Sequence, residues 1–338
     1  MKKLIFLSLI TLIAFTSCKK DNKSTTAATT TPAPPSLKFV FKFDSTQVRL
    51  GDSGQVVSTL PANHRAQNPR FNGMSSHYIE LSPSAATQVG AGVVLYKTTT
   101  VAQNPPITIT NAAGTQTYST AITFDQENVV GQGGQFFSIP LSLVSPGTYQ
   151  YLRISVAYQN YDIHYGILAG TVVNSYTFPS NFYTTGTIAS FIGYNTYIGS
   201  YTIKSQSVTV NGTRQQGYWG FESSPYIINS TTYTIAASQG QTPQGATTVV
   251  NPLFASSAIP PGSCLVTGQF VSPSGTAEAL TITGHETNDI VVTVSMSTNN
   301  SFEWKHNPSN PADNNIYPLN GDTVVNMGVR GMIPKLPQ

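Results

Sequence analysis

Residues 161–167, YDIHYGI, contain the side chains best suited to chemistry in this chain. If the segment is extended, Asn160, Asp162 and His164 project from one face of a strand. A carboxylate and an imidazole two residues apart on a strand can orient each other or supply two metal ligands. The alternative is that they form a structural pair. We predict that Asp162 and His164 are candidate binding residues.

The apolar pattern changes its phase just before this segment. Even-numbered residues from Leu152 to Tyr158 form the apolar face of YQYLRISVAYQ, whereas odd-numbered residues from Tyr161 to Tyr165 form it in the next stretch. A strand changes faces only where its regular alternation is interrupted. The sequence therefore predicts a bulge or bend near Gln159, and bulges concentrate beside functional sites.

Metal ligands are scattered along the chain. None of the five histidines stands in an H-x-H or H-E-x-x-H pattern, so a metal site would have to be assembled from distant residues. The candidate metal ligands are His77, His164, His285, Asp313, Asn315 and Asp322. We expect no cofactor, and calcium or copper is the alternative.

The last three candidates lie in WKHNPSNPADNNIYPLNGDTV, which is rich in the oxygen ligands that calcium prefers. The match to a calcium loop is partial. Tyr317 occupies the third ligand position, and Pro318 stands where a glycine should make the turn. A turn rich in proline and asparagine is therefore the favoured interpretation.

Tyr218 and Trp219 belong to a stretch rich in aromatic residues and amides. Sugar-binding surfaces use such residues, because rings stack on the C–H faces of pyranoses while amides bind the hydroxyls. Aromatic side chains also fill the cores of β-sandwiches. We predict that Tyr218 and Trp219 are candidate binding residues on opposite faces of a strand, with core packing as the alternative.

Motifs of common enzymes are missing from the chain. It contains no G-x-S-x-G elbow, no phosphate-binding glycine loop after a strand and no dinucleotide fingerprint. No sequence feature identifies a pair of catalytic carboxylates. We therefore expect a protein that is not an enzyme.

Cys18 follows two lysines, an apolar stretch over residues 4–15 and the small residues Thr16 and Ser17. The apolar stretch is too short to span a bilayer and has the proportions of a signal peptide. With its cysteine, the segment resembles the lipobox of bacterial lipoproteins, which implies cleavage after residue 17 and lipidation of Cys18. The only other cysteine, Cys264, is then expected to be a buried thiol without a disulfide partner.

Charge and composition favour a cell-envelope β-protein. Charged residues make up 9% of the chain, against about 25% in typical soluble proteins, and no basic stripe favours a nucleic-acid partner. Lysine rather than aspartate follows Cys18, so the inner-membrane retention signal of some lipoproteins is absent. We expect an outer-membrane protein that contacts the membrane through its lipid, and leave open which side of the membrane it faces.

Strand patterns without intervening helices then follow one another along the chain. Residues 18–36 form the lipidated cysteine and a tether rich in threonine and proline, and the alternation in LKFVFKF begins the folded part at residue 37. We predict an all-β fold, an antiparallel β-sandwich of jelly-roll or immunoglobulin-like layout with long loops, over residues 37–338. Two packed β subdomains are the alternative.

Three local features refine this prediction. Asn211-Gly212 is typical of a hairpin turn between two strands, and residues 279–298 resemble another hairpin that turns near His285 to Asp289. Residues 102–120 are expected to be a loop or an excursion on the rim of the sandwich, and a second long loop is expected over residues 239–263.

Several stretches, FKFDSTQVRLGDSGQ, FNGMSSHYIELSP, AYQNYDI and VVNMGVRGMIP, resemble an uncharacterised family of Gram-negative lipoproteins. A fainter resemblance, confined to the first strand and the general β layout, is to MbnP-type copper-binding proteins. These resemblances imply a location and no activity. The hypothesis is a non-catalytic envelope binding module for a glycan, a peptide or a partner protein, and a metal-binding lipoprotein is the alternative.

Overall fold

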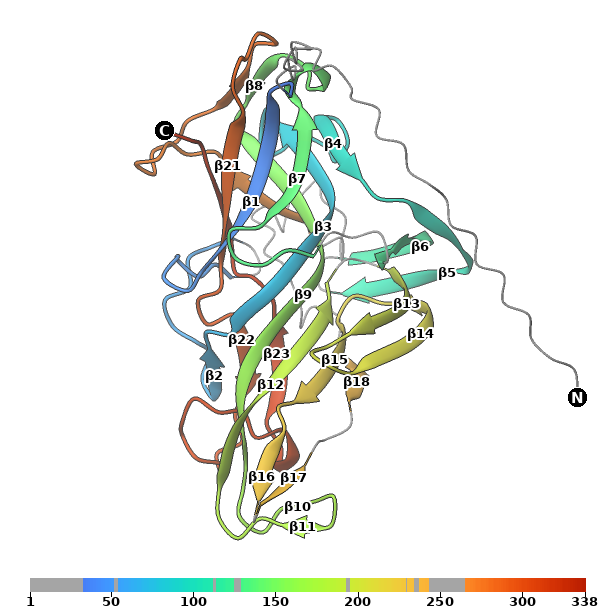
Figure 1. Ribbon diagram of the computed structural model, residues 1–338, viewed down its shortest axis with the longest axis vertical. Coiled ribbons are helices and arrows are strands. Elements are labelled where there is room, and N and C mark those ends of the chain that lie inside the picture. Colours follow the sequence, from blue (N-terminus) through green and yellow to red (C-terminus); the bar gives the residue numbers. More distant parts are fainter. Residues whose placement is uncertain are drawn as a thin grey trace, which may run out of the picture. The chain divides into compact units, whose positions relative to one another are not determined.

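Alternating large apolar residues form the first strand, as predicted. In the computed structural model (Figure 1), β1 (Ser36–Asp44) buries Leu37, Phe39 and Phe41. The structure describes residues 33–51, 54–111, 114–124, 129–192, 195–228, 230–233, 237–242 and 265–338. β1 lies in a four-stranded sheet of order β24 (Met332–Lys335), β21 (Ile290–Ser297), β1 and β7 (Gln135–Pro140). Its pairing with β21 is parallel, and its pairing with β7 is antiparallel.

A seven-stranded antiparallel sheet lies against this one. Its order is β18 (Ser238–Gln241), β15 (Tyr218–Ser223), β12 (Phe182–Phe191), β9 (Tyr151–Ile167), β3 (Arg70–Ser82) and β4 (Val93–Lys97), and β19 (Leu265–Gln269) also pairs with β9. β9 is the long central strand, visible along most of the folded part in Figure 1.

Smaller sheets complete the fold. One consists of β2 (His64–Gln67), β22 (Phe302–Lys305) and β23 (Thr323–Met327), and another of β14 (Ser207–Arg214), β13 (Thr196–Thr202), β6 (Gly114–Thr123) and β5 (Thr100–Asn111). The two-stranded pairs are β20 (Leu280–Ile282) with β8 (Gly147–Tyr149), β10 (Val172–Val173) with β11 (Tyr176–Thr177), and β16 (Tyr226–Ile228) with β17 (Thr231–Tyr233). Short 3-10 turns such as η2 (Leu141–Leu143) and η3 (Pro318–Asn320) join strands.

The main core fills the space between the seven-stranded sheet and the sheets of β1 and β22. It contains Phe39 and Phe41 from β1, Trp304 from β22, and Ile154 and Tyr161 from β9. A smaller cluster around Tyr158 and Phe191 packs on the other face of the seven-stranded sheet, against the sheet of β13. The predicted all-β, antiparallel, sandwich-like fold is confirmed.

Two local predictions were wrong, and of the two alternatives for residues 102–120 the loop was wrong. Asn211 and Gly212 lie inside β14, where the register with β13 shifts and Asn211 has a φ of 45°, so they form a bulge instead of a turn. Residues 102–120 mostly form the β5–β6 hairpin instead of a loop. β20 pairs with β8, whereas β21 pairs with β1 and β24, so residues 280–297 connect different sheets.

Residues Pro34–Gln338 form one compact unit. Within the described residues, no helix has the length and apolar character needed to cross a membrane. Cys18, Cys264, the predicted signal peptide and most of the predicted tether and of the 239–263 loop lie outside the described residues.

Candidate functional site

β9 contains the predicted change of face. Ser75 of β3 pairs with Tyr158 and Ser76 pairs with Val156, so Ala157 is an extra residue in β9. Val156 belongs to the main core, whereas Ala157 and Tyr158 both belong to the smaller cluster on the other face. The bulge lies two residues from the predicted position, and it turns Asp162 and His164 away from the main core.

Asp162 is bound on all sides by other protein groups. Its Oδ1 accepts hydrogen bonds from Thr187 Oγ1 at 2.6 Å and Asn72 Nδ2 at 3.0 Å, and its Oδ2 forms an ion pair with Arg70. Burial raises the pKa of this carboxyl, but the hydrogen bonds from Thr187, Arg70 and Asn72 outweigh burial and hold the pKa below its usual range. Asp162 therefore joins β3, β9 and β12.

His164 is exposed, and its imidazole forms no hydrogen bond or ion pair with any described residue. The backbone of His164, in contrast to its side chain, is hydrogen-bonded to another part of the protein. Its N–H donates to Gln67 Oε1 at 2.7 Å, and its C=O accepts from Gln67 Nε2 at 2.9 Å. Asp162 and His164 share a face of β9, as predicted, but no bond joins their side chains.

Tyr218 and Trp219 do point to opposite faces of β15, and both faces are covered. Tyr218 is 4% exposed within the smaller cluster, where it contacts the rings of Phe191 and Tyr201. Trp219 is half-buried against the main core, and its ring lies so close to Gly240 that a Cβ there would clash with it. Packing accounts for the positions of both rings.

The candidate metal-ligating histidines stand in different environments. His77 is 3% exposed, and its Nε2 lies 2.8 Å from Ser155 Oγ. Burial lowers the pKa of His77 to about 3, which keeps the ring neutral. His285 is exposed in the turn before β21. Among the described residues, no three His, Cys, Asp or Glu side chains gather in a way that would hold a metal ion.

The oxygen ligands near the C-terminus are used by the loop itself. Asp322 is buried, and it accepts hydrogen bonds from Asn310 Nδ2 at 2.8 Å and from the backbone N–H of Tyr317 at 2.9 Å. Asp313 accepts from Tyr317 Oη at 2.8 Å and from the Asn315 N–H at 2.9 Å. These contacts are those of a tightly bonded turn.

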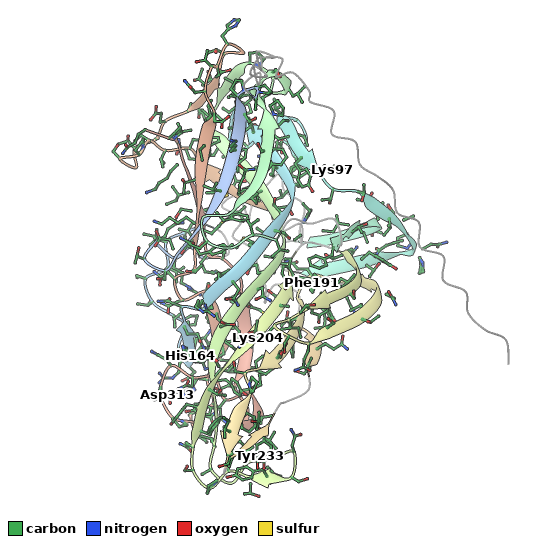
Figure 2. All side chains as sticks on the ribbon, viewed as in Figure 1. Lys97, His164, Phe191, Lys204, Tyr233 and Asp313 are labelled. Atoms are coloured by element: carbon green, nitrogen blue, oxygen red, sulfur yellow. The ribbon has the colours of Figure 1, made fainter. Side chains whose placement is uncertain are left out.

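This loop also meets the strand that carries His164. The Gly166 N–H donates to the Ile316 C=O at 2.9 Å, so the loop continues the edge of β9 where β3 has ended. His164 and Asp313 appear toward the same end of the folded unit in Figure 2. The two predicted sites are thus joined through backbone pairing, and their side chains form no common ligand shell among the described residues.

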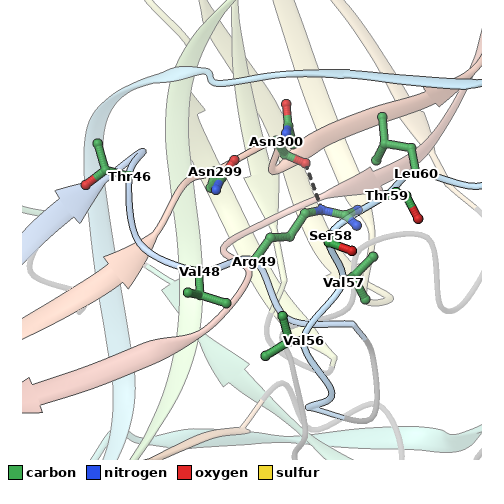
Figure 3. A pocket seen from close by; sticks show the side chains of 10 residues that line it. All are labelled: Thr46, Val48, Arg49, Val56, Val57, Ser58, Thr59, Leu60, Asn299 and Asn300. Carbon is green, nitrogen blue, oxygen red and sulfur yellow. Dashed lines mark hydrogen bonds between the residues drawn. The ribbon is translucent and has the colours of Figure 1, made fainter.

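A pocket of about 280 Å³ lies between the β1–β2 connection and the turn before β22. Its lining residues are Thr46, Val48, Arg49, Val56, Val57, Ser58, Thr59, Leu60, Asn299 and Asn300 (Figure 3). Val48 and Val56 are 54% and 69% exposed, whereas Arg49 is 6% exposed and extends across the pocket. The pocket combines apolar walls, hydroxyls and one buried cation.

Buried polar contacts hold the base of this pocket. Glu303 of β22 forms an ion pair with Arg49, accepts a hydrogen bond from Asn326 Nδ2 at 3.0 Å, and lies 2.6 Å from His64 Nδ1. Burial raises the pKa of Glu303, but the bonds from His64 and Asn326 and the charge of Arg49 outweigh burial and lower it. Glu303 thereby connects the β1–β2 connection with β2, β22 and β23.

Sequence reasoning missed this pocket and its support. Its lining comes from residues 46–60 and from Asn299 and Asn300, about 240 positions later, so no local spacing brings them together. A weak signal was available, since Val48 and Val56 are apolar residues in a segment otherwise rich in glycine and polar residues.

No family model, curated protein or solved structure matched this chain in the comparisons.

Proposed function

We propose that this chain is a lipid-anchored, non-catalytic binding protein of the bacterial outer membrane. In this proposal the lipid on Cys18 holds the folded unit at the membrane, and the β-sandwich binds a glycan, a peptide or a partner protein of the envelope. The anchor is supported by the apolar stretch that ends in Thr16, Ser17 and Cys18.

The observation that carries the binding part is the pocket beside β1 and β22. Ligand sites are concave, mainly apolar and fitted with a few polar groups that set orientation. Val48 and Val56 supply exposed apolar surface, while Ser58 and Thr59 supply hydroxyls that form no hydrogen bond with any described residue. At about 280 Å³ the pocket suits a small part of a larger ligand.

The test is a screen of glycan and peptide arrays with the full-length protein in detergent. The variant Thr59→Trp fills the pocket, and Thr287→Trp places the same ring at an exposed position far from it. We expect array ligands that bind the wild type and Thr287→Trp but lose at least tenfold in affinity with Thr59→Trp. Equal binding by all three proteins would refute the pocket as the binding site.

A further inference from the structure

The main chain beside the pocket has hydrogen-bonding groups that no described residue pairs. Ser58, Thr59 and Leu60 line the pocket, and none of their backbone N–H or C=O groups is bonded to any described residue. The chain around them is paired, because the Val57 N–H donates to Arg49 and the Pro61 C=O accepts from His64. Unpaired main chain beside a concave surface is what a bound peptide can use for backbone pairing.

The pocket walls indicate which side chains such a peptide would carry. Val48 and Val56 expose methyl groups at the pocket, and Val57 and Leu60 add further aliphatic surface. Burial of aliphatic surface of this kind is favourable at roughly 25 cal/mol per Å² of area removed from water. Small aliphatic side chains are the groups that could cover these valines within a pocket of about 280 Å³.

The charge and the aromatic content of the pocket lining further limit the class of ligand that it can bind. Among the described residues that line the pocket, Arg49 is the one with a charge. Its charge is balanced by Glu303, and its Nε donates to the Asn300 C=O at 3.3 Å. A ligand carboxylate would have to compete with Glu303 for that guanidinium. The described lining residues include no aromatic ring, so this part of the lining offers a sugar ring no stacking surface.

We propose that the pocket binds a short uncharged peptide segment with small aliphatic side chains. The side chains lie against Val48 and Val56, and the peptide backbone bonds to the main chain of residues 58–60. This inference rests on the proposed binding function and names its ligand class.

The test measures binding of three probes to the full-length protein in detergent by calorimetry. The probes are a blocked peptide of alternating alanine and valine, the same peptide with aspartate in place of valine, and a neutral oligosaccharide, maltotetraose. The variant Val56→Asn makes the wall polar without adding charge. Its control is Val172→Asn, because Val172 is 62% exposed on β10 and does not line the pocket.

We expect the alanine–valine peptide to bind the wild type at least tenfold more tightly than either other probe. Val56→Asn should lose about tenfold in affinity, and Val172→Asn should bind as the wild type does. Tighter binding of maltotetraose, lost in Val56→Asn, would overturn the peptide inference while the proposed binding function stands. Binding of no probe, or peptide binding that Val56→Asn leaves unchanged, would also overturn the inference.

Discussion

The side-chain amide of Gln67 supplies part of the pairing to β9 between the end of β3 and the C-terminal loop. β3 pairs with β9 as far as Asp162, and the C-terminal loop pairs with β9 from His164 onward, where the Ile316 N–H donates to the His164 C=O at 3.4 Å. The side-chain amide of Gln67, which is 6% exposed, bonds to both the N–H and the C=O of His164. A buried donor or acceptor without its partner costs about 1–3 kcal/mol.

We therefore predict that Gln67→Met destabilises the protein by about 1–3 kcal/mol, because it keeps the side-chain volume but removes both hydrogen bonds. Urea unfolding of the variant would measure the loss. Gln88→Met is the matched control, since Gln88 is exposed and its side chain forms no bond with a described residue. Equal stability of the two variants would show that the amide of Gln67 is dispensable.

Residue types in YDIHYGI predicted a chemical pair, and the structure gives the two residues different roles. The alternation correctly placed Asp162 and His164 on one face, because side-chain direction in a strand is a local property. Their partners are not local. Arg70, Asn72 and Thr187 reach Asp162 from β3 and β12, and no spacing within the sequence indicates those contacts.

At the scale of elements, the sequence predicted individual strands better than it predicted which strands pair with each other. The alternation in β1 and the change of face in β9 follow from residue patterns within single strands, and both are present. Asn211-Gly212 was misread because its left-handed preference suits a bulge as well as a hairpin turn. β20 and β21 are adjacent in sequence, yet β20 pairs with β8 and β21 pairs with β1, each more than 100 residues away.

The connection between β1 and β2 is another element whose position depends on a distant residue. Arg49 in this connection and His64 at the start of β2 both contact Glu303 in β22. Glu303 is 2% exposed, and removing one partner of a buried ion pair costs about 3–5 kcal/mol.

We predict that Glu303→Gln lowers the free energy of unfolding at pH 7 by about 3–5 kcal/mol. Because the folded-state pKa of Glu303 is lowered, its contribution is present above the unfolded value near 4.3 and is lost as pH falls through the folded value. The variant should therefore lose less stability than the wild type on acidification below about pH 4.3. Glu278→Gln, at an exposed position, is the control, and a similar acid profile in all three proteins would contradict this role.

For the whole molecule, His77 links stability to pH near neutrality. The folded protein holds His77 neutral until about pH 3, whereas an unfolded chain protonates histidine near pH 6.5. Between these values the unfolded state binds the extra proton, so stability falls as pH falls, by up to about 1.4 kcal/mol per pH unit.

Replacing His77 with glutamine should flatten this part of the profile. We expect the difference in unfolding free energy between pH 7 and pH 5 to be smaller in His77→Gln than in the wild type, as measured by urea unfolding at each pH. His285→Gln is the control, because His285 is exposed. An unchanged pH dependence in His77→Gln would show that another group controls stability in this range.

The central claim about the whole molecule is the proposal that it is an envelope protein anchored through Cys18. Mass spectrometry of the N-terminal peptide of the protein purified from bacterial membranes tests it most directly. We predict a mature chain that begins at Cys18, carries a thioether-linked diacylglycerol and has an acylated amino group. A mature chain that retains residues 1–17, or an unmodified Cys18 thiol, would contradict the claim.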